Sequence, residues 1–220
     1  MVMGDMEMST DLLVIGGGPG GYGAAFRAAD LGLDVIMVDA LSRPGGVCLH
    51  KGCIPSKTLL HLAELILDAR RAKKMGVAFG EPKLDLAAMI GWKEQVIDSL
   101  ADGLVSLARS RGILLIEGRA RFESSTRVRL SGAEVSSIRF KHGIIATGTR
   151  PLELPGVSFS QTPRIMDSAA ALELPDIPKR LLVVGGGYVG LELGSIYAAL
   201  GSQVTVVERE DRLLTQVDAD

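Results

Sequence analysis

Short apolar runs followed by glycine clusters mark two places where the chain is expected to pass from a strand into a helix. The first run, at 11–15, leads into GGGPGG, and an alanine-rich helical stretch continues to about Leu31. The second run, at 181–184, leads into GGGYVG, and a helix of small residues continues to Leu200. Further apolar runs follow at 35–39 and 204–208. The pattern predicts two βαβ units with buried parallel strands.

Between these two units the apolar spacing becomes that of helices and then that of short strands. Two long helices are predicted over 54–75 and 84–111, and their helically spaced apolar residues are expected to be core: Leu59, Leu62, Ile66, Val96, Leu100, Leu104 and Leu107. Short strands are predicted at 113–117, 119–122, 127–130 and 135–140, then a buried strand at 143–146. Prolines punctuate 151–178, which is predicted to be a linker. The expected fold class is α/β, with two Rossmann-like three-layer units, the second truncated, and a small β-meander insertion.

Both glycine clusters have the spacing G-x-G-x-x-G, and in both an acidic residue follows 23 positions after the first glycine, Asp39 in one and Glu208 in the other. In such a fingerprint the first glycine makes the turn, the second lets the backbone approach a pyrophosphate and the third lets helix and strand pack. The helix N-terminus directs N–H groups at the phosphates, and the acid accepts hydrogen bonds from a ribose. Two ordinary crossovers with glycine turns are the alternative, which the matched spacing disfavours.

Composition narrows the class of protein. The 220 residues are 47% hydrophobic and 23% charged, with a net charge of −2, so no basic surface for nucleic acid is expected. The chain contains no run of about 20 apolar residues, so no membrane span is predicted. Residues 1–10 lack the pattern of a secretory signal, so a cytoplasmic location is expected. His50, His61 and His142 form no plausible ligand cluster, and no metal site is predicted.

Cys48 and Cys53 are the only cysteines, and in a cytosolic protein such a pair is more often catalytic or metal-binding than structural. Positions i and i+5 of a regular helix lie about 8–9 Å apart at Cα, whereas a disulfide needs less than roughly 7 Å. The pair can therefore close only where the helix is broken, and neighbouring glycines allow this. Pro55 suits the first turn of a helix that begins near Cys53, which would favour a thiolate there. Two unlinked buried thiols are the alternative.

The segment Gly45–Lys57, which ends in C-x4-C-I-P-S-K, the two fingerprints and Ala146-Thr147-Gly148 resemble the flavoprotein disulfide reductases, most closely the dihydrolipoamide dehydrogenase group. The resemblance implies that the first fingerprint binds FAD and the second binds NAD. The implied FAD-binding residues are Gly16, Gly18, Gly21, Asp39, Gly46, Lys57, Ala120, Thr147 and Gly148. The implied NAD-binding residues are Gly185, Gly187, Gly190 and Glu208, and the acid favours NAD over NADP because it would repel the extra phosphate. The expected domains are FAD-binding at 1–150, a linker at 151–178 and the start of an NAD-binding domain at 179–220.

The same resemblance implies the catalytic roles. Cys48 would exchange with substrate, Cys53 would lie under the flavin as the charge-transfer thiolate, and Lys57 would sit beside the flavin and pair with Glu192. Dihydrolipoamide would be oxidised through a Cys48–Cys53 disulfide and FAD, and hydride would pass to NAD+. The implied partners are the dihydrolipoyl groups of 2-oxo acid dehydrogenase complexes or of the glycine cleavage system, and the implied assembly is a homodimer.

Three departures from the family pattern qualify these expectations. Asp39 stands where glutamate is common, and His50-Lys51 stands where Asn-Val is usual. The chain also ends at Asp220, before the C-terminal dimerisation domain that carries the family's His–Glu pair. It is expected to be a fragment or a shortened gene product that does not turn over by itself. The alternatives are an enzyme of the mercuric or glutathione reductase type, which Ile54-Pro55-Ser56 and Glu208 disfavour, and a non-catalytic flavin-binding module.

Overall fold

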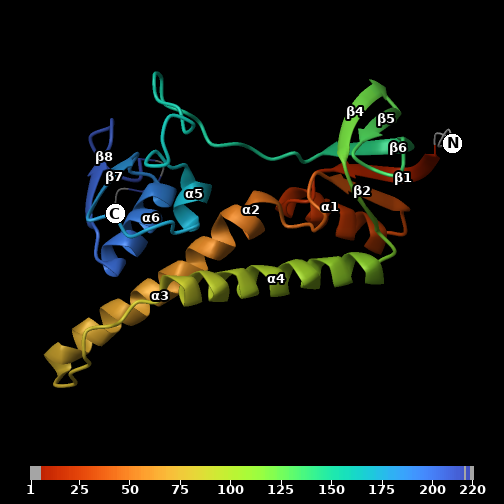
Figure 1. The fold of residues 1–220 in the computed structure, drawn as a ribbon. Coiled ribbons are helices and arrows are strands. Elements are labelled where there is room, and N and C mark those ends of the chain that lie inside the picture. Colours follow the sequence, from red (N-terminus) through yellow and green to blue (C-terminus); the bar gives the residue numbers. More distant parts are fainter. Residues whose placement is uncertain (1–5, 216, 219–220) are drawn as a thin grey trace. The chain divides into compact units, whose positions relative to one another are not determined.

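The computed structural model describes residues 6–215 and 217–218, and the chain separates into two compact units (Figure 1). The first unit comprises residues 1–50 and 97–150, and the second comprises 51–96 and 151–220. A six-stranded sheet lies in the first unit and a two-stranded sheet in the second. None of the helices in the described part of the chain is long and apolar enough to cross a membrane.

The sheet of the first unit has the strand order β3-β2-β1-β6-β5-β4. Its parallel part consists of β1 (Glu7–Ile15), β2 (Val35–Asp39), β3 (Leu114–Glu117) and β6 (Ser137–Ile145). The helix α1 (Pro19–Asp30) connects β1 to β2, as the apolar pattern predicts. Antiparallel β5 (Arg127–Ser131) and β4 (Arg119–Ser124) extend the sheet beyond β6. The predicted meander therefore continues the main sheet and shares β6 with it.

Alternating residues of the parallel strands build two cores in the first unit. Leu12, Val14 and Met37 pack with Ala25 and Ala28 of α1 on one face. The residues between them face the other way and pack with the inward side chains of the meander: Leu13, Ile36, Val38, Val128, Leu130, Ile138 and Phe140. The two-residue period of the strands thus places an apolar layer on each side of the sheet.

The prediction of a separate buried strand at 143–146 is wrong in two respects. Residues 137–145 form one continuous strand, β6, and its last five residues, 141–145, are exposed. These residues pair only with β1, because β5 reaches β6 only through Ser137, Ile138 and Arg139. One edge of the end of β6 is therefore left open in the described part of the chain.

Helices dominate the second unit. α3 (Cys53–Ala72) continues into a 3-10 turn at Lys73–Met75, α5 (Ser168–Leu172) is short, and α6 (Tyr188–Leu200) connects β7 (Arg180–Val184) to the parallel β8 (Gln203–Val207). Two helices join the units along the chain: α2 (Gly46–Lys51) and α4 (Leu86–Ser110). The core of the second unit combines α3, α5 and α6: Leu59, Leu172, Leu174, Leu193, Ile196, Tyr197 and Leu200.

The prediction that the strands of the second unit are buried is wrong. Leu182 and Val184 of β7 are 60% and 56% exposed, and Val207 of β8 is 44% exposed. Both strands alternate between exposed and half-buried residues. The reason is that α6 covers one face of this sheet, while the described residues leave the other face open.

The apolar stripe predicted along α4 coincides only in part with the face of α4 that is buried. Leu100 and Leu107 are exposed, whereas Ile97, Ala101 and Ala108 are buried. Lys93, four positions before Ile97, is also buried, and its Nζ donates to the Leu172 carbonyl oxygen at 3.0 Å. The contact face of α4 thus combines one isoleucine, two alanines and a paired lysine. Hydrophobicity alone does not reveal such a face.

Candidate functional site

The first and third glycines of the first fingerprint are held at distances that leave no room for a side chain. Gly16 has φ +106°, and a Cβ built on it would lie 2.2 Å from the Ala146 carbonyl oxygen. A Cβ built on Gly21 would lie 1.7 Å from the Gly16 carbonyl oxygen. The first and third glycines therefore serve close backbone packing, as the motif predicts. The same contact places Ala146, and with it Thr147, beside the fingerprint, because the Thr147 nitrogen is 3.1 Å from the Cβ built on Gly16.

The second glycine of the motif, Gly18, is the N-cap of α1. It has no side chain to cap the helix, and the first turn of α1 contains no acidic residue. Gly46, with φ +58°, lies against it, since a Cβ built on Gly46 would be 2.6 Å from the Gly18 Cα. A helix N-terminus without a side-chain cap and with a side-chain-free approach is suited to a phosphate anion. Gly148, which follows Thr147, also has positive φ, +70°.

Asp39, at the end of β2, turns its carboxylate back to the fingerprint. One oxygen, Oδ2, accepts the Gly17 N–H, and the other, Oδ1, accepts the Leu41 N–H at 2.8 Å. The Asp39 carbonyl oxygen accepts the Gly118 N–H at 2.7 Å, which brings the start of β4, and so half-buried Ala120, next to the end of β2.

The second fingerprint repeats this backbone geometry in the second unit. Gly185 has φ +105°, Gly187 is the N-cap of α6, and a Cβ built on Gly190 would lie 2.4 Å from the Gly185 carbonyl oxygen. One difference is visible at the first glycine. No atom lies within 4 Å of a Cβ built on Gly185, because the described part of this unit has no strand in the place that β6 takes beside Gly16.

Glu208 follows β8 and takes the place that Asp39 takes in the first unit. Its Oε2 accepts the Gly186 N–H at 2.6 Å, and its Oε1 accepts the N–H groups of Arg209 and Glu210 at 2.6 and 3.1 Å. These bonds, that of Gly186 first, lower the pKa of the Glu208 carboxyl below its usual value. The group is thus held as a carboxylate with backbone donors.

The cysteines lie on two successive helices. Half-buried Cys48 is on α2, and exposed Cys53 is the first residue of α3. Gly52 separates the helices with φ −147° and ψ −110°. The predicted helix start near Cys53 is confirmed, and the helix is broken between the two cysteines, as a disulfide would require. The disulfide itself stays a prediction.

Lys57 and Glu192 are in contact within the second unit. The Lys57 Nζ lies 2.6 and 2.8 Å from the two carboxylate oxygens of Glu192, and the Ser56 Oγ donates to Glu192 Oε2 at 3.3 Å. The Lys57 side chain is 58% exposed and that of Glu192 27% exposed. The pairing that the resemblance implies is therefore present, while a role beside a flavin stays a prediction.

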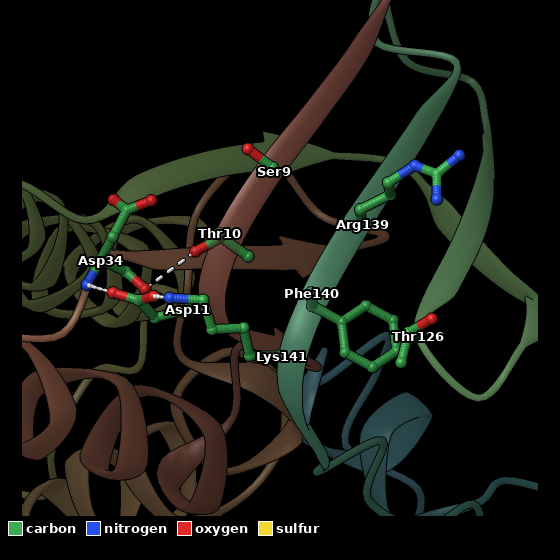
Figure 2. Close-up of a pocket in the computed structure, with 8 residues that line it drawn as sticks. All are labelled: Ser9, Thr10, Asp11, Asp34, Thr126, Arg139, Phe140 and Lys141. Carbon is green, nitrogen blue, oxygen red and sulfur yellow. Dashed lines mark hydrogen bonds and ion pairs between the residues drawn. The ribbon is translucent and has the colours of Figure 1, made fainter.

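A cavity of about 510 Å³ in the first unit lies apart from these groups (Figure 2). β1 lines it with residues 9–11, whereas the fingerprint follows the other end of this strand. Three of its charged residues form ion pairs, Lys141 with Asp11 at 2.6 Å and Arg139 with Glu7 at 3.0 Å. The Lys141 ammonium is the main reason why the pKa of Asp11 is lowered. None of the predicted site residues lines this cavity.

Comparison with known proteins decides the family. The model of the family described as pyridine nucleotide-disulphide oxidoreductase matches residues 10–220. This chain belongs to that family. Dihydrolipoyl dehydrogenase from Haemophilus influenzae is 46% identical over 97% of the chain, and that from Halobacterium salinarum is 43% identical over the whole chain. The chain spans 45% and 47% of the length of these relatives.

Solved structures of the family share the fold. The HOCl-induced flavoprotein disulfide reductase RclA from Escherichia coli is 29% identical, with a TM-score of 0.79 over 96% of this chain and 44% of that protein. The Cu(II) complex of the same reductase is 28% identical, with a TM-score of 0.78 over 95% of this chain and 44% of that protein. The α/β fold class predicted from the sequence is confirmed.

Sequence reasoning missed two glycines of the site, Gly17 and Gly186. Each is the first x of its G-x-G-x-x-G motif, and each donates its N–H to the acid at the end of the following strand. A signal was present, since both fingerprints have glycine at this variable position.

Proposed function

We propose that this chain provides the FAD-binding and dithiol part of a dihydrolipoyl dehydrogenase, which oxidises dihydrolipoyl groups and reduces NAD+. The observation that carries the proposal is the contact of Gly46 with Gly18. Gly46 begins α2, the helix of Cys48, so the segment of the dithiol packs directly on the phosphate-binding glycine of the fingerprint. Relatives named dihydrolipoyl dehydrogenase at 43–46% identity support this substrate class.

The residues around the first fingerprint fit FAD. Gly16, Gly18, Gly21 and Gly46 would surround the pyrophosphate, because none of them carries a side chain and the N-terminus of α1 is bare. Asp39 would accept the hydroxyl groups of the adenosine ribose, and the other proposed binding residues are Lys57, Ala120, Thr147 and Gly148. FAD, when bound, would carry electrons between the dithiol and NAD. We propose residues 1–150 as the FAD-binding domain and 151–178 as the linker.

Residues 179–220 would begin the NAD-binding domain. Gly187 at the N-terminus of α6 leaves the approach to the pyrophosphate open, while Gly185 and Gly190 make the tight turn into that helix. Glu208 is held as a carboxylate by backbone N–H groups, so it would accept ribose hydroxyls and repel the additional phosphate of NADP. NAD is therefore the proposed electron acceptor.

The thiol chemistry needs one exchanging and one resolving sulfur. A dihydrolipoyl thiolate would attack the Cys48 Sγ, which breaks the Cys48–Cys53 bond and releases the Cys53 thiolate. The second dihydrolipoyl thiolate would then attack the mixed disulfide and release Cys48, leaving oxidised lipoyl and a reduced cysteine pair. Lys57 would supply positive charge one turn beyond Cys53, and Glu192 would hold the Lys57 ammonium in place.

The proposed partners follow from this reaction. The dihydrolipoyl groups would be those of 2-oxo acid dehydrogenase complexes or of the glycine cleavage system, and the protein would act as a homodimer. The names of the relatives support the dihydrolipoyl substrate.

An FAD titration of the purified chain, followed by flavin fluorescence, tests the cofactor site. We expect saturable binding, and we expect Gly46→Ala to weaken it by about tenfold or more because the added Cβ would meet Gly18. Gly32→Ala is the matched control: Gly32 also has positive φ, +86°, but no atom lies within 4 Å of its Cβ position. Equal FAD affinity of the two variants, or no FAD binding by the unaltered chain, would contradict the proposal.

A further inference from the structure

The internal repeat of this chain extends beyond the fingerprint to the loop that follows each acid. Residues 209–214 lie 169 positions after residues 40–45, the same offset that relates the glycines and the acids of the two units. The first amide of each fingerprint donates to the strand that follows: Gly16 to Val38 O and Gly185 to Val207 O, both at 2.8 Å. The loop then returns to the fingerprint in both units, where Gly45 N–H donates to Gly17 O at 2.7 Å and Leu214 N–H donates to Gly186 O at 3.0 Å.

The loop and the acid both lie against the same glycine, where a side chain would otherwise stand. A Cβ built on Gly17 would lie 3.2 Å from the Asp39 carboxylate and 3.3 Å from the Pro44 Cα. A Cβ built on Gly186 would lie 3.2 Å from the Glu208 carboxylate and 2.4 Å from the Leu213 Cδ2. Pro44 and Leu213 occupy equivalent positions of the repeat. Both residues thus lie beside that glycine, Pro44 with its Cα and Leu213 with the end of its side chain.

An arginine anchors each loop one position earlier. Arg43 lies 2.5 Å from Asp98 and 3.2 Å from Asp102, which are one turn apart on α4. Arg212, its counterpart in the repeat, donates to the carbonyl oxygens of Thr215 and Val217 at 3.3 and 3.4 Å. Each loop is therefore held both by the fingerprint and by its own arginine.

We propose that residues 40–45 and 209–214 are a matched pair of straps that hold the ribose-facing acid of each nucleotide site. Pro44 and Leu213 are positioning residues: by packing on Gly17 or Gly186 beside the carboxylate, they keep the amide of that glycine on that carboxylate. This inference rests on the proposed function, since the ligand of the acid would be the ribose of FAD or NAD.

The second strap is the more sensitive of the two. Leu214 has φ +53°, a conformation that leucine rarely adopts, whereas its counterpart is Gly45. Leu213 is 50% exposed, so its contact with Gly186 is a surface contact whose loss leaves the core of the unit intact. The strap can therefore be loosened at Leu213 without unfolding the unit around it.

Amide hydrogen exchange of Leu213→Ala tests the strap without any ligand. We expect exchange at Gly186 and Leu214 to become about tenfold faster, because both amides lose the packing that holds their hydrogen bonds, while the β7 amides keep their rates. Leu182→Ala is the matched control, an exposed leucine of β7 in the same unit. Unchanged exchange at Gly186 in Leu213→Ala would overturn the proposal.

A compensating pair gives a second test. Gly186→Ala is expected to push the Leu213 side chain off the glycine and to speed exchange at Leu214. In the double variant Gly186→Ala/Leu213→Ala the added Cβ no longer meets the Leu213 Cδ2, so exchange at Leu214 is expected to be slower than in Gly186→Ala. A double variant that exchanges as fast as Gly186→Ala would contradict the packing of Leu213 on Gly186.

NADH titration separates the strap from the proposed function. Absent NADH binding by the unaltered chain counts against the proposed function, and the exchange data alone decide the strap.

Discussion

The Tyr197 hydroxyl is the most deeply buried polar group of α6. The side chain is 1% exposed, and its hydroxyl donates to the Ala171 carbonyl oxygen at 2.8 Å. Burial, with a smaller effect of the Asp176 charge, raises the pKa of Tyr197 to about 12. The neutral form therefore contributes to the stability of the second unit, and this contribution depends on pH.

Tyr197→Phe is expected to lower the free energy of unfolding by about 1 kcal/mol, because the Ala171 carbonyl loses its donor. In the unaltered chain the contribution of the neutral hydroxyl is complete below the ordinary tyrosine pKa of 10.0 and is lost as the pH rises through about 12. Urea unfolding across this range should therefore show a steeper loss of stability in the unaltered chain than in Tyr197→Phe. Identical slopes for both proteins would contradict the assigned pKa.

Among the elements, those with local signals could be predicted from the sequence. The fingerprint glycines fix the start of α1 and α6, Gly201 with φ +117° ends α6, and Pro55 marks the first turn of α3. α5 was missed, although Asp167 is a signal for it: its side chain accepts the Ala170 N–H at 2.8 Å and so caps the helix. The short length of α5 and the prolines around it hid this cap.

Burial of the elements could not be predicted in the same way, because it depends on what covers each face. The apolar runs of β7 and β8 are the same kind of sequence as those of β1 and β2, yet only the latter are covered on both sides. The candidate site shows the same limit. The motif glycines and the acids could be predicted from their spacing. The N–H donation of Gly17 and Gly186 to these acids depends in addition on the loop that folds back onto each glycine.

Leu182→Ala and Ile196→Ala test this view of the second unit. Leu182 is 60% exposed on the open face of β7, so its truncation should change the free energy of unfolding by less than about 1 kcal/mol. Ile196 is 1% exposed in the core between α6 and α3, so its truncation should cost about 3 kcal/mol. Chemical denaturation of the purified variants would measure both changes. A loss at Leu182 as large as that at Ile196 would show that the open face is covered in solution.

Across the whole molecule, one structural arrangement occurs twice: a glycine turn, a helix N-terminus without a side-chain cap and an acid held by a backbone amide. Its first copy contacts the segment that leads to the only two cysteines of the chain. The sequence alone predicted this association from a resemblance, and the structure adds the contact of Gly46 with Gly18 and the helix break at Gly52. The proposed function therefore depends on a dithiol that opens and closes beside a nucleotide.

A count of free thiols in the denatured chain tests that dependence most directly, because Cys48 and Cys53 are the only thiols that can react. After mild oxidation we expect a monomeric chain with no free thiol, and after treatment with dihydrolipoamide we expect two. Cys48→Ser should retain one thiol in both states. Two thiols that persist through oxidation, or thiols lost only by cross-linking between chains, would contradict the redox pair.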